Sequence, residues 1–196
     1  MHLRLPFLFG FFCFALGGLL YVSLALPLPQ SAAAIPGAAH AFAGIPVRLH
    51  IARLGIDASI VPVALTPAGA MDVPGRADDV GWFSPGARPG NGGNAVLTGH
   101  LDTVANTPGV FWELHQLAEG DVIDIVDDRN AVHHFRVERQ RVFPVDRMPL
   151  PEIFGNASGS LLQLITCDGA WQQSHHRYDE RLVVTARATG ADPSDG

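Results

Sequence analysis

The sequence predicts an all-β barrel that is exported behind an N-terminal apolar segment. From Val47 onward, short runs rich in β-branched residues are separated by turns rich in Gly, Pro and Asp. Little of this region has helical periodicity, and short strands at close intervals are typical of a barrel. A chain of 196 residues is long enough for an export or membrane segment and one globular domain.

The apolar segment is the first expected element. Residues 5–28 carry no charge and are long enough to cross a bilayer as a helix. Because Arg4 precedes them, the positive-inside rule places the N-terminus in the cytoplasm and the rest of the chain outside. We expect an uncleaved anchor over 1–29. The alternative is a cleavable signal peptide, for which Ala41-Phe42-Ala43 offers a processing site. Both alternatives export the domain.

The remaining elements follow in chain order. An Ala-, Gly- and Pro-rich stretch predicts a flexible linker over 30–45, and the domain is expected over 46–190, followed by a flexible tail over 191–196. Gly55 predicts a turn between the first two strands, and breakers predict a long loop over 75–94. Helical spacing of apolar residues predicts one short helix over 109–117. The strands are expected at 47–54, 58–65, 95–100, 121–127, 131–145, 160–167 and 181–187.

The charge distribution excludes several functions. Arg4 is the one charged residue before Pro46, which leaves 12 basic residues against 19 acidic ones in the rest of the chain, a charge of about −7. Nucleic-acid binding needs a basic face, so we expect none. The same charge would be repelled by anionic lipid, so a membrane link must come from the N-terminus. The sequence contains no lysine, which excludes lysine-based covalent catalysis.

Cys167 is the first candidate for chemistry. The other cysteine, Cys13, lies in the apolar segment, so a disulfide between them is implausible, and a CxxC zinc pair is absent from the sequence. Cys167 ends an expected strand and precedes a polar loop, where a ligand can reach the thiol. By position alone it could still be a buried, inert cysteine.

A catalytic thiol needs an acid or base and a group that stabilises negative charge on the carbonyl oxygen. His100 closes the expected strand 95–100, and His175 and His176 lie in the loop after Cys167, so spacing alone leaves these histidines nearly equal. Arg181 opens the strand after that loop. If the two flanking strands are neighbours, its guanidinium lies next to Cys167, although a surface arginine paired with a nearby acidic residue is the alternative.

Three motifs taken together resemble the sortases, the cysteine transpeptidases of bacterial cell surfaces. They are "TGHLD" at 98–102, "LITC" at 164–167 and a downstream arginine in "RLVVTA", behind an N-terminal apolar segment. The resemblance extends from about Val47 to Ala188. The compact size and the Pro/Gly-rich lead-in to "GHLD" are most similar to class F sortases. The family motif is TLxTC, and Gln163 stands at its first threonine position, so we assign Gln163 no role.

The resemblance implies a fold and a set of residue roles. It implies a closed eight-stranded β-barrel with one or two short helices. It assigns the nucleophile to Cys167, the general acid/base to His100 and transition-state stabilisation with substrate binding to Arg181. Thr166 matches the motif threonine before the cysteine and, with Trp171 from the following loop, is expected to bind substrate. No cofactor or metal is expected.

The implied reaction is transpeptidation at the cell wall. Cys167 would attack the peptide bond after the threonine of an LPxTG-like sorting signal and form a thioacyl enzyme, which an amine acceptor of the cell-wall precursor resolves. The expected partners are therefore sorting-signal proteins and that acceptor. We expect a monomer in the bacterial cell membrane, with a single N-terminal span and an extracellular catalytic domain.

Several readings remain open at this point. Asp102 could orient His100 or form a turn. His175, His176 and Tyr178 could line or cover the site. Four acidic residues could suggest calcium but lack EF-hand spacing, which favours a solvated strand face; they are Asp121, Asp124, Asp127 and Asp128. The functional alternatives are another cell-wall cysteine transpeptidase and a non-catalytic β-barrel that binds peptides or partners.

Overall fold

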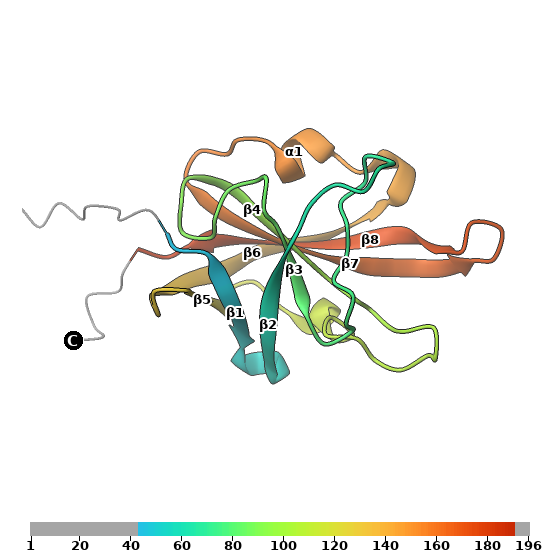
Figure 1. Cartoon of the computed structure of the whole chain (residues 1–196), viewed down its shortest axis with the longest axis horizontal. Helices are drawn as coiled ribbons and strands as arrows, with labels where there is room; N and C mark the ends of the chain where they lie inside the picture. The colour runs from blue at the N-terminus through green and yellow to red at the C-terminus, as the bar shows by residue number, and fades with distance from the viewer. Residues whose placement is uncertain (1–42, 191–196) are drawn as a thin grey trace, which may run out of the picture. The chain divides into compact units, whose positions relative to one another are not determined.

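The computed structural model describes residues 43–190, which fold as a closed barrel of eight strands (Figure 1). Around the barrel the strands lie in the order β1-β2-β3-β4-β7-β8-β6-β5. Their bounds are β1 Pro46–Ile51, β2 Ile56–Val63, β3 Val80–Phe83, β4 Gly93–Gly99, β5 Val122–Asp127, β6 Val132–Pro144, β7 Ser160–Gln172 and β8 Arg177–Ala188. The β2/β3 and β4/β7 pairs are parallel, and the other pairs are antiparallel. The predicted all-β, eight-stranded class is confirmed.

Helices are few and short among the described residues. α1 covers Leu150–Phe154, and 3-10 helices cover Ala52–Leu54, Leu114–Gln116 and Val145–Arg147. Gly55 ends the first 3-10 helix with a φ of 63°, a left-handed conformation that glycine adopts without a steric penalty. The predicted turn at Gly55 is therefore confirmed.

The helix predicted over 109–117 is confirmed only as the three-residue 3-10 helix Leu114–Gln116. The segment forms consecutive turns whose backbone hydrogen bonds join residues three apart, among them Leu114 N to Phe111 O and Leu117 N to Leu114 O. Phe111, Leu114 and Leu117 are fully buried in the barrel core. Their spacing of three matches the period of a 3-10 turn, in which such residues fall on one face.

Two strand predictions also need correction. β3 lies inside the predicted loop 75–94, where four residues that include Gly81 are too few to show alternation. β3 is held by ladders on both sides, with β2 and with β4. Cys167 does not end its strand, because β7 continues through a polar segment to Gln172, paired with the start of β8 at Arg177.

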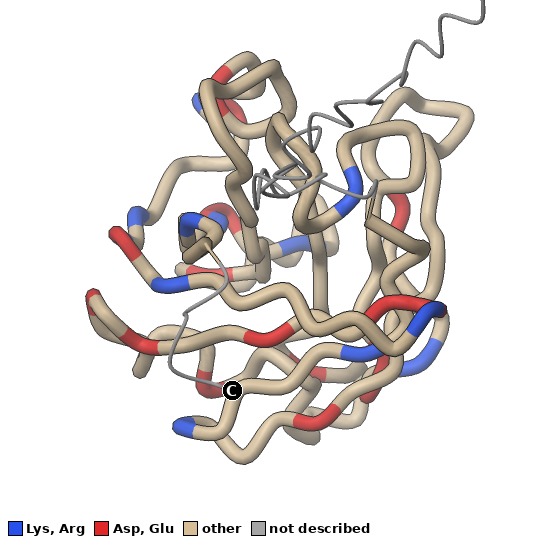
Figure 2. Tube along the Cα trace, turned by 90° about the vertical axis from the view of Figure 1, so that its left-hand side faces the viewer, with Lys and Arg blue, Asp and Glu red and all other residues tan. Residues whose placement is uncertain are grey.

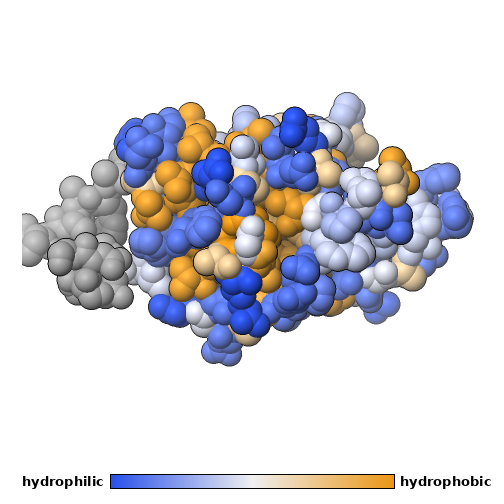
Figure 3. All heavy atoms as spheres, turned by 90° about the horizontal axis from the view of Figure 1, so that it is seen from below, coloured by the Kyte–Doolittle hydropathy of each residue, from blue (hydrophilic) through white to orange (hydrophobic). Residues whose placement is uncertain are grey.

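The barrel separates two groups of apolar side chains. Alternate residues such as Leu97, Leu164 and Val184 point into the main core. A smaller cluster on the outer face of β4, β7 and β8 contains Val96, Ile165 and Val183, and Ile153 from α1 packs on it. The segment between β6 and β7 therefore covers part of the outer face. The side of the molecule seen in Figure 3 shows hydrophobic side chains near its middle, flanked by hydrophilic ones.

The two ends of the barrel differ. The β7–β8 hairpin projects at the right in Figure 1, whereas the first and last described residues lie at the left. Seen from that left-hand end, acidic and basic residues are interspersed along the chain, without a face of one sign (Figure 2).

The predicted anchor at 1–29, the tail at 191–196 and nearly all of the linker at 30–45 lie outside the described residues. Within residues 43–190, no helix is both long enough and apolar enough to span a bilayer.

Candidate active site

Cys167 and Arg181 are directly opposed in the β7–β8 ladder. Their neighbours Thr166 and Leu182 are buried, whereas Cys167 and Arg181 are partly exposed. Because side chains alternate along a strand, the thiol and the guanidinium lie on the outer face of the barrel. The condition stated from the sequence, that the two strands flanking the 168–180 segment are neighbours, is met.

Opposing effects act on the Cys167 thiol. Partial burial raises its pKa, because the apolar surroundings disfavour the thiolate. The positive charge of Arg181 lowers the pKa, and the negative charge of Asp102 raises it. The net pKa is above the ordinary value, so the thiol is the dominant form at neutral pH.

The Arg181 guanidinium is held by main-chain oxygens of its own strand. Its Nη1 donates to the carbonyl oxygens of Glu180 at 2.6 Å and Tyr178 at 3.2 Å. These bonds fix one edge of the guanidinium beside Cys167. The remaining N–H groups of a guanidinium can donate to an anionic oxygen.

His100 directly follows β4, which pairs with β7. Its Nε2 donates to the carbonyl oxygen of Pro74 at 2.7 Å, because a carbonyl can only accept. The backbone of His100 packs against Gly109, where an added Cβ would lie 2.4 Å from the His100 oxygen. Phe111 N also donates to that oxygen at 2.9 Å. The ring and the main chain of His100 are thus fixed by two different loops.

Thr166 is only 3% exposed, and its hydroxyl donates to the Gly99 carbonyl oxygen at 2.9 Å. This bond links the residue before the cysteine to the residue before the histidine. The predicted substrate contact of Thr166 stays a prediction, and the structure gives its side chain this structural bond.

Asp102 makes a different contact from the imidazole contact considered from the sequence. Its Oδ2 accepts a hydrogen bond from the Tyr178 hydroxyl at 2.5 Å, and its backbone forms an isolated β-bridge with Pro108. The hydrogen bond to Asp102, followed by burial, raises the pKa of Tyr178 to about 12, so the hydroxyl stays protonated. Trp171 is 46% exposed and lies edge-on to the Tyr178 ring at 5.3 Å.

The two histidines close to Cys167 in sequence lie farther along the hairpin. His175 and His176 are exposed in the turn beyond the Gln172–Arg177 pair, and His175 Nδ1 is 2.9 Å from the Ser174 hydroxyl oxygen. Their closeness in sequence therefore does not place them in the ladder row of Cys167 and Arg181.

Other residues named from the sequence have structural partners. Gln163 is buried, and its Oε1 accepts from the Thr185 hydroxyl at 2.8 Å. The four acidic residues considered for calcium are engaged separately: Asp121 with Arg53 and Ala118 N, Asp124 with His134, Asp127 with His133 and backbone N–H groups, and Asp128 with Ile45 N.

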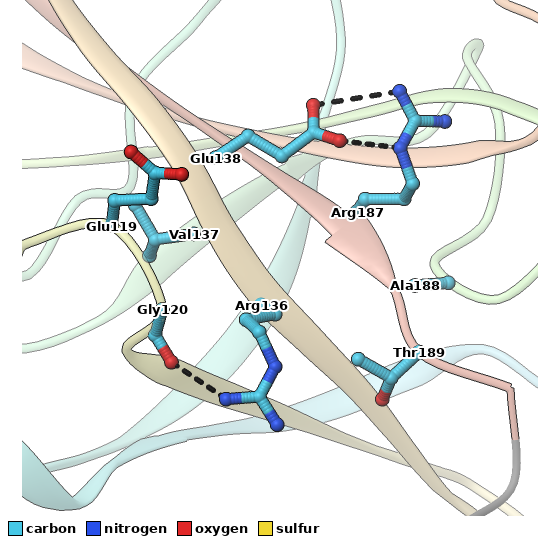
Figure 4. A pocket seen from close by; sticks show the side chains of 8 residues that line it. All are labelled: Glu119, Gly120, Arg136, Val137, Glu138, Arg187, Ala188 and Thr189. Carbon is cyan, nitrogen blue, oxygen red and sulfur yellow. Dashed lines mark hydrogen bonds and ion pairs between the residues drawn. The ribbon is translucent and has the colours of Figure 1, made fainter.

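A hollow of about 300 Å³ lies elsewhere, along β6 and the end of β8 (Figure 4). In it, Arg187 pairs with Glu138, and Arg136 donates to the Gly120 carbonyl oxygen at 2.8 Å. Both arginines already have partners within the protein, so this hollow is a weaker candidate site than the Cys167 region.

Sequence reasoning missed two contacts at the site. The Pro74 carbonyl leaves no signal in the sequence, because every residue carries one. From the sequence, Tyr178 is one of several residues that could line or cover the site, and its hydrogen bond to Asp102 joins residues 76 positions apart. Only the folded barrel brings them together.

Solved structures share this fold. A lid mutant of sortase A from Corynebacterium diphtheriae has a TM-score of 0.60 at 20% identity and covers 78% of this chain and 74% of its own. Sortase C-1 from Actinomyces oris has a TM-score of 0.58 at 23% identity, covering 74% and 75%. A Clostridium perfringens sortase D5 transpeptidase has a TM-score of 0.56 at 21% identity, covering 75% and 79%. At these identities the likeness shows the fold.

The family follows from the sequence comparison. No curated protein matches the chain. The family model for the sortase domain, however, matches residues 49–189, most of the chain and nearly all of the described barrel. The chain therefore belongs to the sortase family and is a cysteine transpeptidase of the cell wall.

Proposed function

We propose that Cys167 is the nucleophile, His100 the general acid/base and Arg181 the transition-state stabiliser of this transpeptidase. The observation that carries the proposal is the cross-strand pairing of Cys167 with Arg181 on the outer face of the barrel. A fixed cation beside the thiol supports both the thiolate and a developing oxyanion. His100 extends from the strand adjacent to β7, which supports its role as the proton carrier.

The proposed reaction has two halves. Cys167 transfers its proton to His100, and the thiolate attacks the carbonyl carbon of the threonine in the sorting signal; the resulting oxyanion is stabilised by Arg181. The C–N bond then breaks, and the departing amine takes a proton from charged His100. An incoming amine attacks the thioester, loses its proton to His100 and releases the Cys167 thiolate. Water in place of the amine gives hydrolysis.

The Pro74 contact supports one of the two ring nitrogens of His100 as the proton carrier in this reaction. Nε2 carries a proton and donates it in a hydrogen bond to the Pro74 carbonyl oxygen. In the neutral ring, the lone pair is therefore on Nδ1. The charged ring gains its second N–H there. We therefore assign proton transfer to Nδ1.

We propose that the acyl substrate is an LPxTG-like sorting signal. On the outer face that carries Cys167, Val96, Ile165 and Val183 form a buried apolar layer, and the partly buried Phe143 and Met148 pack against it. These partly buried side chains at the margin of the layer support contact with the leucine and proline of an extended signal, and Trp171 is exposed on the hairpin beyond Cys167. The acceptor is proposed to be an amine of the cell-wall precursor.

We also propose that the enzyme belongs to class F and acts as a monomer, with a catalytic domain over 46–190. The Pro/Gly-rich lead-in to "GHLD" and the compact size support the class. The uncharged run at 5–28 supports a membrane anchor with the catalytic domain outside the cell. N-terminal sequencing of the mature protein tests the anchor, which predicts an intact segment 1–29.

The nucleophile is tested with the full-length protein in detergent, an LPxTG peptide library and a primary amine. Mass spectrometry is expected to detect a thioacyl adduct on Cys167 and an amine-exchanged product. Cys167→Ala should abolish both, whereas the matched control Cys13→Ala should retain them. Absence of both species with the wild type, or their persistence in Cys167→Ala, would overturn the assignment.

The acid/base is tested by comparing two histidines. We expect His100→Ala to reduce kcat/KM by at least about 10²-fold, since general acid/base catalysis contributes about that much. His175→Ala, at the exposed tip of the hairpin, should stay within about twofold of wild type. The opposite pattern would move the role to the hairpin.

A further inference from the structure

The segment that carries His100 leaves the sheet just before the site. Strand pairing between β4 and β7 ends at Thr98 opposite Ile165, whereas β7 and β8 remain paired at Cys167 and Arg181. The ladder therefore fixes the thiol relative to the guanidinium, but it does not extend to the imidazole. The placement of His100 against this pair depends on contacts made by loops and side chains.

Tyr178 makes three contacts that join these segments. Its hydroxyl donates to Asp102, two residues after His100, at 2.5 Å. Its carbonyl oxygen accepts from Arg181 Nη1 at 3.2 Å. Its ring meets Trp171 of β7 edge-on at a centroid distance of 5.3 Å. One residue thus contacts the loop after His100, the guanidinium of Arg181 and the strand of Cys167.

The hairpin that carries Tyr178 is irregular where this link forms. The β7–β8 register shifts between Asp168 and Trp171, directly after Cys167, and Ala170 and Trp171 are exposed. A ladder that has a register shift and a solvent-exposed side restrains its strands less than the ladders of the barrel core do. The hydrogen bond from Tyr178 to Asp102 is a restraint from outside the hairpin.

We propose that Tyr178 is a positioning residue that ties the loop following His100 to the strand of Arg181 at the flank of Cys167. This proposal rests on the catalytic roles proposed above. Tyr178 acts through its neighbours and takes no part in bond making or proton transfer. Its hydroxyl is the group that makes the tie.

The tie has an electrostatic consequence at the thiol. Arg181 from β8 and Asp102 from the loop after β4 act on the charge of Cys167, and Tyr178 from β8 interacts with both Asp102 and Cys167. Asp102 disfavours the thiolate and Arg181 favours it. By donating to Asp102, the Tyr178 hydroxyl disperses the carboxylate charge. Loss of the hydroxyl should therefore make the thiolate harder to form, and loss of the carboxylate should make it easier.

Alkylation of Cys167 tests the tie without any substrate. Iodoacetamide is applied to the full-length protein across a pH series, and peptide mass spectrometry separates Cys167 from Cys13. We expect Asp102→Asn to lower the midpoint of the alkylation profile and Tyr178→Phe to raise it. In the Asp102→Asn background, Tyr178→Phe should have no effect. Shifts of both single variants in the same direction, or a persisting Tyr178→Phe shift in the double variant, would overturn the proposal.

Asp146→Asn is the matched control. The Asp146 side chain is 82% exposed and pairs with Arg177 of the β7–β8 hairpin. The variant therefore removes one carboxylate and its ion pair with the hairpin. The carboxylate is absent from the groups that act on Cys167, and the midpoint should stay at the wild-type value. A shift equal to that of Asp102→Asn would show that any loosening of the hairpin moves the thiol, which contradicts a specific role for Tyr178.

Turnover provides the second readout. With an LPxTG peptide, Tyr178→Phe is expected to lower kcat about tenfold while KM changes less than twofold, since misplacement of catalytic groups acts mainly on the chemical step. A loss confined to KM would contradict positioning. If the wild type shows no turnover, the proposed function fails, and the alkylation profiles still decide whether the tie exists.

Discussion

At the scale of single residues, the Cys167 thiol lies between opposing influences. Burial and Asp102 raise its pKa, and Arg181 lowers it without restoring the ordinary value. Only a minority of molecules hold the thiolate at neutral pH. The placement of Arg181 directly opposite Cys167 therefore affects both the formation of the nucleophile and the stabilisation of the oxyanion.

The first prediction concerns this pair. The pKa of Cys167 is raised, so its alkylation rate should increase with pH and reach half its maximum above the midpoint of a free cysteine. Arg181→Gln removes the nearby cation and should move the midpoint higher. It should also lower kcat/KM by about 10²- to 10³-fold, the usual effect of losing an oxyanion-stabilising group.

Arg177→Gln is the control for that prediction. Arg177 lies on the same strand and pairs with Asp146, but it is not among the groups that act on Cys167. In Arg177→Gln, the alkylation profile of Cys167 should match that of the wild type.

In the wild type, a Cys167 midpoint below that of free cysteine would show that the Arg181 cation outweighs burial. This result would contradict the predicted direction.

At the scale of elements, a buried asparagine helps to hold the segment between β6 and β7 over the outer face of the barrel. Asn94 of β4 is 5% exposed, and its Nδ2 donates to the carbonyl oxygens of Glu152 at 2.8 Å and Gly155 at 2.9 Å. α1 has only five residues, too few to be stable alone. Its position over the apolar layer near Cys167 therefore depends on Asn94 and on Ile153.

The second prediction is that Asn94→Ala loosens α1. Two carbonyl oxygens lose their buried donor, so the free energy of unfolding should fall by about 2 kcal/mol, measured by urea denaturation. Hydrogen exchange should increase over 148–155 before it increases in β7. With an LPxTG peptide, KM should rise more than kcat falls, because the apolar layer is disturbed while the thiol is untouched.

The exposed Asn156 provides the control, and Asn156→Ala should leave stability and exchange unchanged within about 0.5 kcal/mol. Unchanged exchange over 148–155 in Asn94→Ala would mean that other contacts hold the segment.

At the scale of the whole molecule, the sequence predicted the barrel class because the class depends on local strand patterns. It left the Cys167–Arg181 contact conditional on the pairing of two strands, which the folded barrel supplies. It missed β3, whose four residues become a strand only between two partners. It ended the Cys167 strand too early, because the polar residues after Cys167 lack a strand pattern and pair only through β8. The contacts of His100 with Pro74 and of Asp102 with Tyr178 depend on loops brought together by closure of the barrel.

Closure also fixes the end of the barrel opposite the hairpin. Asp127 is 2% exposed and accepts hydrogen bonds from Gly44 N at 2.7 Å, Arg129 N at 2.9 Å and Ala131 N at 3.0 Å. His133 Nε2 lies 3.0 Å from its Oδ2. Burial opposes ionisation of Asp127, but the His133 bond and the backbone donors outweigh it and lower the pKa to about 2. The start of the described chain is thus held to the turn between β5 and β6.

The third prediction follows from this carboxylate. Its pKa is lower in the folded protein, about 2, than the ordinary 3.8, so its contribution to stability is present above about pH 4 and is lost as the pH falls through 2. In Asp127→Asn, a side-chain NH2 in the place of Oδ2 faces the Gly44 N–H group. Two donors then meet, and the Gly44 N–H group loses its acceptor. We expect a loss of about 3 kcal/mol at pH 7 and a flatter decline of stability between pH 4 and 2, measured by urea denaturation across pH.

Asp128→Asn, which removes a neighbouring carboxylate but leaves the partners of Asp127 in place, should keep the steep acid decline. Asp127 accepts from Gly44 N near the start of the described chain, which lies at the end of the barrel away from the hairpin (Figure 1), so kcat/KM of folded Asp127→Asn should stay within about twofold of wild type. A large loss of activity at full folding would show that the two ends of the barrel are coupled.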